Sequence, residues 1–294
     1  MIIAMKIRGI FLGLIFTVSV PSFALQGASG GEPAGYCVSV KNTPVLNTPD
    51  FRSVFGGADG KTLKLDSSGL LRELEFIAFP GTVFTIHERI PGSDILRVST
   101  PDYPYNDDAL FIDRRFVAEK NIPPRAGERA PPPAAEIIRK LESMLGQEYL
   151  WGGNTDSGVP CMAGYYGPEG STADGVMRIW ELMGVDCSGL LYFAADGYTP
   201  RNTSSLVNFG EGLDIAGLDA DEIARLLRPL DLIAWAGHVI IVMNEDSVIE
   251  SSLSGGVHKS PVSGRLEELL RARAPADDRD GSSGRRFVVR RWLK

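Results

Sequence analysis

The sequence predicts an α+β protein with two domains, and three features of the chain support this fold class. Residues 36–120 contain short apolar runs separated by turn residues, which is the pattern of a small all-β domain. A proline-rich stretch at 121–133 follows and predicts a semi-rigid linker. Residues 134–294 contain both helical and strand-like stretches, so we expect a mixed second domain.

The N-terminus has the features of a secretory signal peptide over residues 1–24. Two basic residues precede an apolar run at 10–20, which is too short for a typical membrane-spanning helix. A small-residue cleavage pattern ends at Ala24. We therefore expect an exported protein, periplasmic or extracellular, with a flexible lead at 25–35. The alternative is an N-terminal membrane anchor.

Charge and composition narrow the classes of partner. Cleavage after Ala24 removes two of the 30 basic residues and none of the 37 acidic ones, which leaves a formal charge of −9. A negative chain argues against nucleic acid and anionic membranes as partners. Hydrophobic residues make up 44% of the chain, which is enough to bury a sizeable core, and we expect a monomer.

Local patterns predict the elements of both domains. Residues 82–86 alternate between polar and apolar side chains, and residues 95–98 follow a Pro-Gly-Ser-Asp turn, so both should be strands. A helix is expected at 134–145, because its apolar residues share one face and Gly146 follows as a stop. Further expected elements are strands at 109–113, 115–117 and 287–289, helices at 220–227 and 264–272, and a loop at 274–284.

Cys187 and His238 stand in local contexts that suit a nucleophile and a base. Cys187 opens a helical run, and the unpaired N–H groups and macrodipole of a helix N-terminus lower the pKa of a thiol. His238 begins an apolar run at 238–243 that is typical of a buried strand. An imidazole on a strand facing a helix N-terminus is the arrangement of papain-like cysteine enzymes.

Glu250 is the candidate third member. A turn signal follows the strand of His238, and a second apolar run contains Glu250. A hairpin folded about Asn244 would set Glu250 opposite His238 and Val248 opposite Ile240, all on one face. A carboxylate there could fix the tautomer of the imidazole and stabilise the imidazolium. A one-residue slip would separate the pair.

Six short motifs in order resemble the NlpC family of bacterial cell-wall cysteine peptidases, over residues 134–260 or so. They are Tyr149-Leu150-Trp151-Gly152-Gly153, Asp186-Cys187-Ser188-Gly189-Leu190, Pro200-Arg201-Asn202-Thr203-Ser204, Leu230-Asp231-Leu232-Ile233, Gly237-His238-Val239 and Val248-Ile249-Glu250-Ser251. The all-β domain resembles the bacterial Src-homology-3-like barrel that accompanies such peptidases.

The resemblance implies a papain-like fold with Cys187 as nucleophile and His238 as base. Tyr149 would lie near the oxyanion position, Asp186 would help to hold the substrate, and Ser188 belongs to the same substrate-binding and oxyanion group. The implied substrate is a peptidoglycan stem peptide, L-Ala-γ-D-Glu-diamino acid, cut after the γ-linked D-glutamyl residue. No cofactor is implied, and three histidines without Cys-x-x-Cys spacing make a metal site unlikely on sequence grounds.

Two departures from the family leave alternatives open. The third catalytic position is commonly histidine in the family but is Glu250 here, and His258 is a possible substitute. The stretch at 154–185 is longer than usual, and it could be a lid or an inert surface insertion. Alternative functions are an amidase or acyltransferase on the same Cys/His scaffold, and a non-catalytic wall-binding module.

Two further expectations concern pairings between distant residues. Cys37 and Cys161 could form a disulfide or remain two free thiols. A docked first domain would wall off one end of the cleft, where Asp186, Asp107 or Asp108 could bind the free α-amine of a terminal L-alanine. We therefore expect free stem peptides to be cut much faster than N-acetylated peptides or intact sacculi.

Overall fold

The computed structural model describes residues 33–104, 110–124, 127, 129–170, 173–278 and 285–293. The expected signal peptide and most of the lead lie outside these residues, as do Asp107 and Asp108. In the described part of the chain, no helix combines the length and apolar character needed to span a membrane.

The first domain is built on an antiparallel sheet of seven strands among the described residues. Its strands are β1 (Gly35–Ser39), β2 (Thr43–Leu46), β5 (Leu74–Ala78), β6 (Val83–Arg89), β7 (Ile95–Ser99), β8 (Leu110–Asp113) and β9 (Val117–Lys120). They follow the order β5-β2-β8-β7-β6-β1-β9, so β5 and β9 are edges and the sheet does not close. The expectation of a closed Src-homology-3-like barrel is therefore not met by this sheet.

A side chain from the second domain covers the free edge of β5. The Ile77 N–H donates to Asn154 Oδ1, and Asn154 Nδ2 donates to the Ile77 carbonyl, both at 2.9 Å. Asn154 is completely buried. Its amide thus takes the place of a neighbouring strand and satisfies the backbone N–H and C=O of Ile77, although the sheet stays open.

One expected strand of this domain is a turn. Residues 114–116 form a short 3₁₀ helix, Arg114–Phe116, before β9 begins. The Asp113 carboxylate accepts a hydrogen bond from the Arg115 N–H at 2.8 Å and so caps the turn. Local capping by an aspartate outweighs the strand propensity of the apolar residues here.

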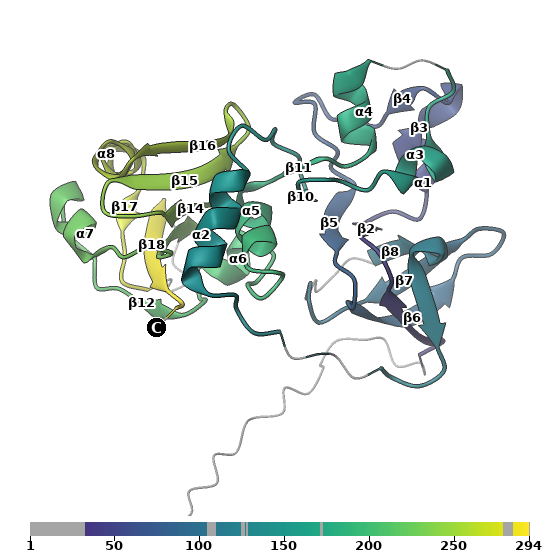
Figure 1. Ribbon diagram of the computed structural model, residues 1–294, viewed down its shortest axis with the longest axis horizontal. Coiled ribbons are helices and arrows are strands. Elements are labelled where there is room, and N and C mark those ends of the chain that lie inside the picture. Colours follow the sequence, from purple (N-terminus) through teal and green to yellow (C-terminus); the bar gives the residue numbers. More distant parts are fainter. Residues whose placement is uncertain are drawn as a thin grey trace, which may run out of the picture. The chain divides into compact units, whose positions relative to one another are not determined.

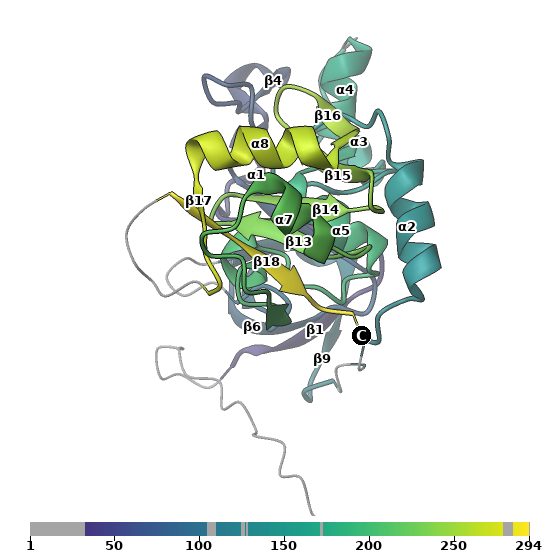
Figure 2. The same ribbon diagram turned by 90° about the vertical axis from the view of Figure 1, so that its left-hand side faces the viewer.

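The second domain has three layers, with a sheet between two groups of helices (Figures 1 and 2). The sheet order is β12-β18-β13-β14-β15-β16, with β17 parallel to β18. The strands are β12 (Glu211–Gly212), β13 (Leu232–Trp235), β14 (His238–Val242), β15 (Ser247–Ser252), β16 (Gly256–Pro261), β17 (Ala274–Pro275) and β18 (Arg286–Arg291). The helices are α2 (Ala134–Ser143), α5 (Cys187–Ala194), α6 (Thr203–Leu206), α7 (Ala220–Leu226) and α8 (Val262–Ala272).

Alternating side chains of the sheet form two apolar cores. Val239, Ile241 and Ile249 pack against α2 and α5, whereas Ile240 and Val242 pack in the cluster that contains α7 and α8. The predicted helix at 134–145 ends at Ser143 as α2. Met144 is buried in place of the expected Leu145, which is 44% exposed, because the helix ends before Leu145 reaches the apolar face.

The long stretch at 154–185 is neither a lid nor an inert insertion. Its elements are β10 (Asn154–Thr155), α3 (Cys161–Tyr166), α4 (Asp174–Trp180) and β11 (Gly184–Val185). Helices α3 and α4 lie beside α1 (Phe51–Val54), β3 (Phe55–Gly56), the 3₁₀ helix Gly57–Asp59 and β4 (Thr62–Leu63) (Figure 1), whereas β10 and β11 contact α5. Trp180 and Phe51 belong to one buried cluster, and the Tyr166 hydroxyl donates to Asp113 at 2.7 Å. The stretch therefore packs the two domains together.

The disulfide alternative is settled by the cysteine positions. Cys37 lies buried in β1, and Cys161 begins α3. Both are free thiols, as is Cys187.

Candidate active site

Cys187 is the first residue of α5, and its neighbours fix the start of that helix. The Asp186 carboxylate accepts a hydrogen bond from the Gly189 N–H at 2.6 Å, which is the usual way in which aspartate caps a helix. The Cys187 side chain is only 6% exposed. Its Sγ lies 4.0 Å from the Gly237 carbonyl oxygen and accepts from the Val239 N–H. The thiol therefore touches the backbone on both sides of His238.

The environment of the thiol opposes ionisation, contrary to the sequence-based expectation. Burial raises the pKa of Cys187 to about 12, and the Asp186 carboxylate adds to this effect. Arg201 and the amides of Val239 and Ser188 act in the opposite direction but are weaker. A helix N-terminus does not lower this pKa because desolvation and a neighbouring anion outweigh it. The thiol is thus protonated at neutral pH and needs a base during attack.

His238 and Glu250 lie together as predicted, although the register is different. His238 Nε2 and Glu250 Oε2 are 2.6 Å apart. The paired residues of β14 and β15 are Ile241 with Ile249 and Val242 with Val248, and continuing this register places Glu250 opposite Ile240. The predicted register is therefore wrong by two residues. A two-residue shift preserves the face of every side chain, so the pair meets diagonally.

Arg265 on α8 is a partner of Glu250 that sequence reasoning missed. Its Nε donates to Oε1 at 2.6 Å, and its Nη2 donates to Oε2 at 3.1 Å. Burial alone would raise the pKa of Glu250, but hydrogen bonds from His238 and Arg265 hold it at about 2. His258 is not the third member here, since its Nδ1 hydrogen-bonds the Gly256 carbonyl at 3.0 Å.

The thiol and the imidazole come from distant parts of the chain and are not hydrogen-bonded to each other in the described residues. The His238 ring lies 5.1 Å from the Trp235 ring, and its hydrogen bond goes to Glu250. Cys187 packs in the core on the α5 side of the sheet, whereas His238 shares the opposite face with Ile240 and with Glu250, which Arg265 of α8 contacts. The expectation that the imidazole faces the start of α5 is therefore wrong. Catalytic hydrogen bonds are often long without substrate and tighten when it binds. Proton transfer from Cys187 therefore requires the imidazole to approach the sulfur.

Asp186 and Ser188 belong to a buried network around Arg201. Asp186 accepts from Arg201 Nη2 at 2.7 Å and Nη1 at 2.9 Å, and from the Gly152 N–H at 3.0 Å. Ser188 Oγ accepts from Arg201 at 2.9 Å and donates to Asp186 at 3.2 Å. Arg201 also donates to the Gly153 carbonyl at 3.1 Å and is 2% exposed. This network holds the start of α5; substrate binding by Asp186 and Ser188 stays a prediction.

Two donors near the thiol are available for an oxyanion. The Tyr149 hydroxyl has no hydrogen-bond partner among the residues that the structure describes. Burial raises its pKa, with Asp186 and Cys187 adding to the effect, so it remains a proton donor. The Cys187 backbone N–H, at the first position of α5, also has no partner in the described ranges.

A cavity of about 130 Å³ lies beside the thiol and is lined from both domains. Its lining residues are Glu75, Tyr103, Tyr149, Trp151, Gly152, Asp186, Cys187, Ser188, Arg201, Asn202, Thr203 and Gly237. Glu75 accepts from the Tyr103 hydroxyl and from Asn47 Nδ2, both at 2.7 Å. In the described part of the chain, no cationic side chain pairs with it. Nothing in the sequence singled out Glu75, because it becomes part of the site only when the domains pack.

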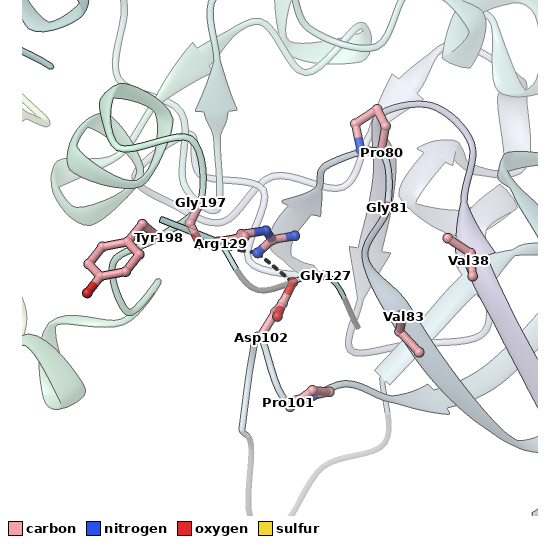
Figure 3. A pocket seen from close by; sticks show the side chains of 10 residues that line it. All are labelled: Val38, Pro80, Gly81, Val83, Pro101, Asp102, Gly127, Arg129, Gly197 and Tyr198. Carbon is pink, nitrogen blue, oxygen red and sulfur yellow. Dashed lines mark hydrogen bonds and ion pairs between the residues drawn. The ribbon is translucent and has the colours of Figure 1, made fainter. Parts of the chain in front are cut away.

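Another cavity lies away from the thiol. It measures about 620 Å³ and surrounds Arg129, which lies between Gly197 and Asp102 (Figure 3). Arg129 pairs with Asp102 at 2.7 Å and donates to Thr82 Oγ1 at 3.0 Å and to the Gly197 carbonyl at 3.1 Å. This linker arginine thus ties both domains together, as a docked arrangement requires.

A further cavity, of about 340 Å³, shares lining residues with both of these. It shares Tyr103 and Asn202 with the cavity beside the thiol, and it shares Asp102 and Tyr198 with the cavity around Arg129. The first domain therefore contributes lining residues to the cavity beside the thiol, among them Glu75 and Tyr103. The expected preference for free peptides stays a prediction.

No family model and no curated protein matches the chain. Solved structures that align with it include an NlpC/P60 family protein from Bacillus cereus, with 15% identity and a TM-score of 0.35 over 88% of this chain and 63% of that one. The chain thus spans less than two thirds of that protein. A P60 domain of a Mycobacterium avium subspecies paratuberculosis antigen has 23% identity and a TM-score of 0.31, over 53% and 93%.

RipD from Mycobacterium tuberculosis, described as a non-catalytic NlpC/p60 domain protein adapted to peptidoglycan binding, also aligns. It has 19% identity and a TM-score of 0.32, over 54% of this chain and 97% of RipD. The aligned solved structures are thus NlpC/P60 proteins, and TM-scores this low carry no conclusion about the activity of this chain.

Proposed function

We propose that the protein is an exported cysteine peptidase that hydrolyses the γ-D-glutamyl–diamino acid bond of peptidoglycan stem peptides. One observation carries the proposal: the Cys187 thiol borders a cavity and contacts the backbone on both sides of His238, whose ring Glu250 holds. A buried nucleophile, a base and an orienting acid are the parts that acyl transfer needs.

The chemistry follows from these positions. His238 takes the Sγ proton as the sulfur of Cys187 attacks the γ-glutamyl carbonyl carbon. The Tyr149 hydroxyl and the Cys187 N–H are the candidate donors to the resulting oxyanion. Collapse breaks the C–N bond, and the imidazolium gives its proton to the leaving amine. Water, with His238 again as base, then hydrolyses the thioester and releases the γ-carboxylate.

Glu75 supports a substrate with a free α-amine. Its carboxylate lines the cavity, and its partners Asn47 and Tyr103 are neutral donors. An ammonium group of a terminal L-alanine would supply the missing cation. Asp186, which the sequence suggested for this task, already accepts from Arg201. We therefore assign amine recognition to Glu75 in the proposed peptidase.

Mass spectrometry of muropeptides digested with the purified protein tests the function. We expect free L-Ala-D-Glu and a peptide that begins with the diamino acid, and none of either with Cys187→Ala. Glu75→Gln should raise KM for the free peptide by about tenfold, the loss of one charge-assisted contact, and leave KM for an N-acetylated peptide unchanged. Release of a whole stem peptide, or of an acyl-transfer product, would instead identify an amidase or acyltransferase.

A second candidate is a non-catalytic wall-binding module. Two observations favour it: the raised pKa of the Cys187 thiol, and the lack of a hydrogen bond between that thiol and His238 within the described chain. RipD, which is described as non-catalytic and adapted to peptidoglycan binding, would be another protein of this kind. Labelling of Cys187 by iodoacetamide at neutral pH distinguishes the candidates. If the protein is a binding module, the rate of Cys187 labelling should be the same in His238→Ala as in the wild type. The protein should then bind sacculi without hydrolysing them.

A further inference from the structure

Glu250 lies at a junction of three elements. Its Oε2 faces His238 Nε2 of β14 at 2.6 Å, and Arg265 of α8 approaches both of its oxygens, at 2.6 Å and 3.1 Å. The Glu250 side chain is 3% exposed, so water does not compete for these positions. The guanidinium fork and the carboxylate thus form a two-point contact, which fixes the direction in which the carboxylate faces the imidazole.

The groups around Glu250 show why this contact matters. The titratable and charged side chains that face it are His238 from β14, its cross-strand partner His258 from β16, and Arg265 from α8. Arg265 also contacts Glu268, at 3.3 Å. A buried carboxylate without a cation takes up a proton, whereas arginine keeps its charge at every working pH. Among the residues that the structure describes, Arg265 alone offers Glu250 a permanent positive charge.

We propose that Arg265 is a positioning residue of the active site: its guanidinium holds Glu250 in place and ionised beside His238. A carboxylate can then serve as the third catalytic residue, a position at which the NlpC family, which this chain resembles, commonly has histidine. This inference rests on the proposed Cys187–His238 chemistry, because Arg265 touches neither the thiol nor the cavity.

Carboxyl ¹³C NMR of glutamate-labelled protein tests the charge of Glu250 directly, with its signal assigned by loss in Glu250→Gln. In the wild type the signal should titrate near pH 2. In Arg265→Met, burial acts without the compensating cation, so the titration should move up by at least about two pH units. A titration that stays in place overturns the inference. If Arg265→Met does not fold, Arg265→Gln removes the charge but keeps a donor and gives the same measurement.

Alkylation of Cys187 by iodoacetamide, followed by peptide mass spectrometry, tests the consequence for the thiol. In Arg265→Met the rate at neutral pH should fall by about tenfold, and the acid-side loss should begin about one pH unit higher. Arg265→Lys should restore the pH profile but only part of the rate, since lysine has charge without the fork. Arg271→Met is the matched control, because Arg271 on the same helix is itself exposed and its ion pair within the described residues is with the exposed Glu267, at 3.4 Å.

A double-mutant cycle separates positioning from a general structural role. In a Glu250→Gln background, Arg265→Met should cost no further reactivity, because the carboxylate that it positions is gone. An equal loss in both backgrounds overturns the inference. Reactivity of the wild-type thiol that does not change in His238→Ala contradicts the peptidase instead, and the carboxyl titration still decides the role of Arg265.

Discussion

The site contains two carboxylate–arginine pairs that look alike and do different work. Asp186 with Arg201 lies beside the nucleophile, and Glu250 with Arg265 lies beside the base. The first pair is enclosed by further hydrogen bonds from Ser188 and backbone groups. In the second pair, Glu250 Oε2 also contacts the His238 imidazole. The first pair therefore serves the fold of the helix start, whereas the second contacts the imidazole that acts as the base in the proposed mechanism.

Removal of the sulfur should give the largest effect and leave both pairs intact. Cys187→Ala deletes only Sγ, so the contacts of Asp186 with Arg201 and of Glu250 with Arg265 have no reason to change. We expect no thioester and turnover below a few per cent of wild type, measured on muropeptides, with an unchanged circular dichroism spectrum. Substantial remaining turnover would remove Cys187 from the mechanism.

Substitution of Glu250 should separate the second pair from the first. Glu250→Ala leaves His238 without an acceptor, and loss of an orienting residue costs about 10²–10⁴ in rate. Glu250→Gln and Glu250→His should cost less, since each can still accept a hydrogen bond from the ring. Steady-state kinetics on one peptide measures all three. Equal and small losses would mean that the 2.6 Å contact has no role in turnover.

Substitution of Arg201 should affect stability where Arg265 affects reactivity. Arg201→Met leaves the Asp186 carboxylate buried without its cation and should lower the free energy of unfolding by about 3–5 kcal/mol. Arg265→Met should cost less, because the Arg265 side chain is 22% exposed. Urea denaturation measures both, with Arg271→Met as a control expected within about 0.5 kcal/mol of wild type. A larger loss of unfolding free energy in Arg265→Met than in Arg201→Met would contradict the roles assigned to the two pairs.

The pH dependence of stability should carry the signature of the second pair. The pKa of Glu250 is lowered from 4.5 to about 2, so its contribution is present above pH 4.5 or so and is lost as the pH falls towards 2. Across that window the wild type should lose on the order of 3 kcal/mol relative to Glu250→Gln. Parallel stability curves for the two proteins would show that Glu250 is not held ionised by its partners.

Sequence patterns predicted the parts of the site that depend on local structure. The start of α5 at Cys187 and the strand of His238 follow from capping and apolar periodicity. The shared face of His238 and Glu250 was right and their register was wrong by two residues, because Met243 and Ser247 close the turn one residue later than a fold about Asn244 would. Period-two alternation fixes a face but not a register.

The unpredicted residues reach the site through tertiary packing. Glu75 comes from a different sheet and Arg265 from a helix beyond the hairpin, so no spacing in the sequence links them to Cys187 or His238. Strand patterns likewise could not predict that the first sheet stays open. Strands β6, β7 and β8 were expected at their positions, but the arrangement of the sheet depends on which group satisfies the edge of β5.

The Asn154 amide has a consequence for how this protein could fail. A bare strand edge offers its N–H and C=O groups to any other extended chain, and such edges seed intermolecular pairing. On β5 the Asn154 side chain occupies the N–H and C=O groups of Ile77, and Arg201 contacts this side chain at 3.3 Å. The same arginine binds Asp186 at the start of α5, so loss of Arg201 would be expected both to disturb the surroundings of Cys187 and to expose this edge to intermolecular pairing.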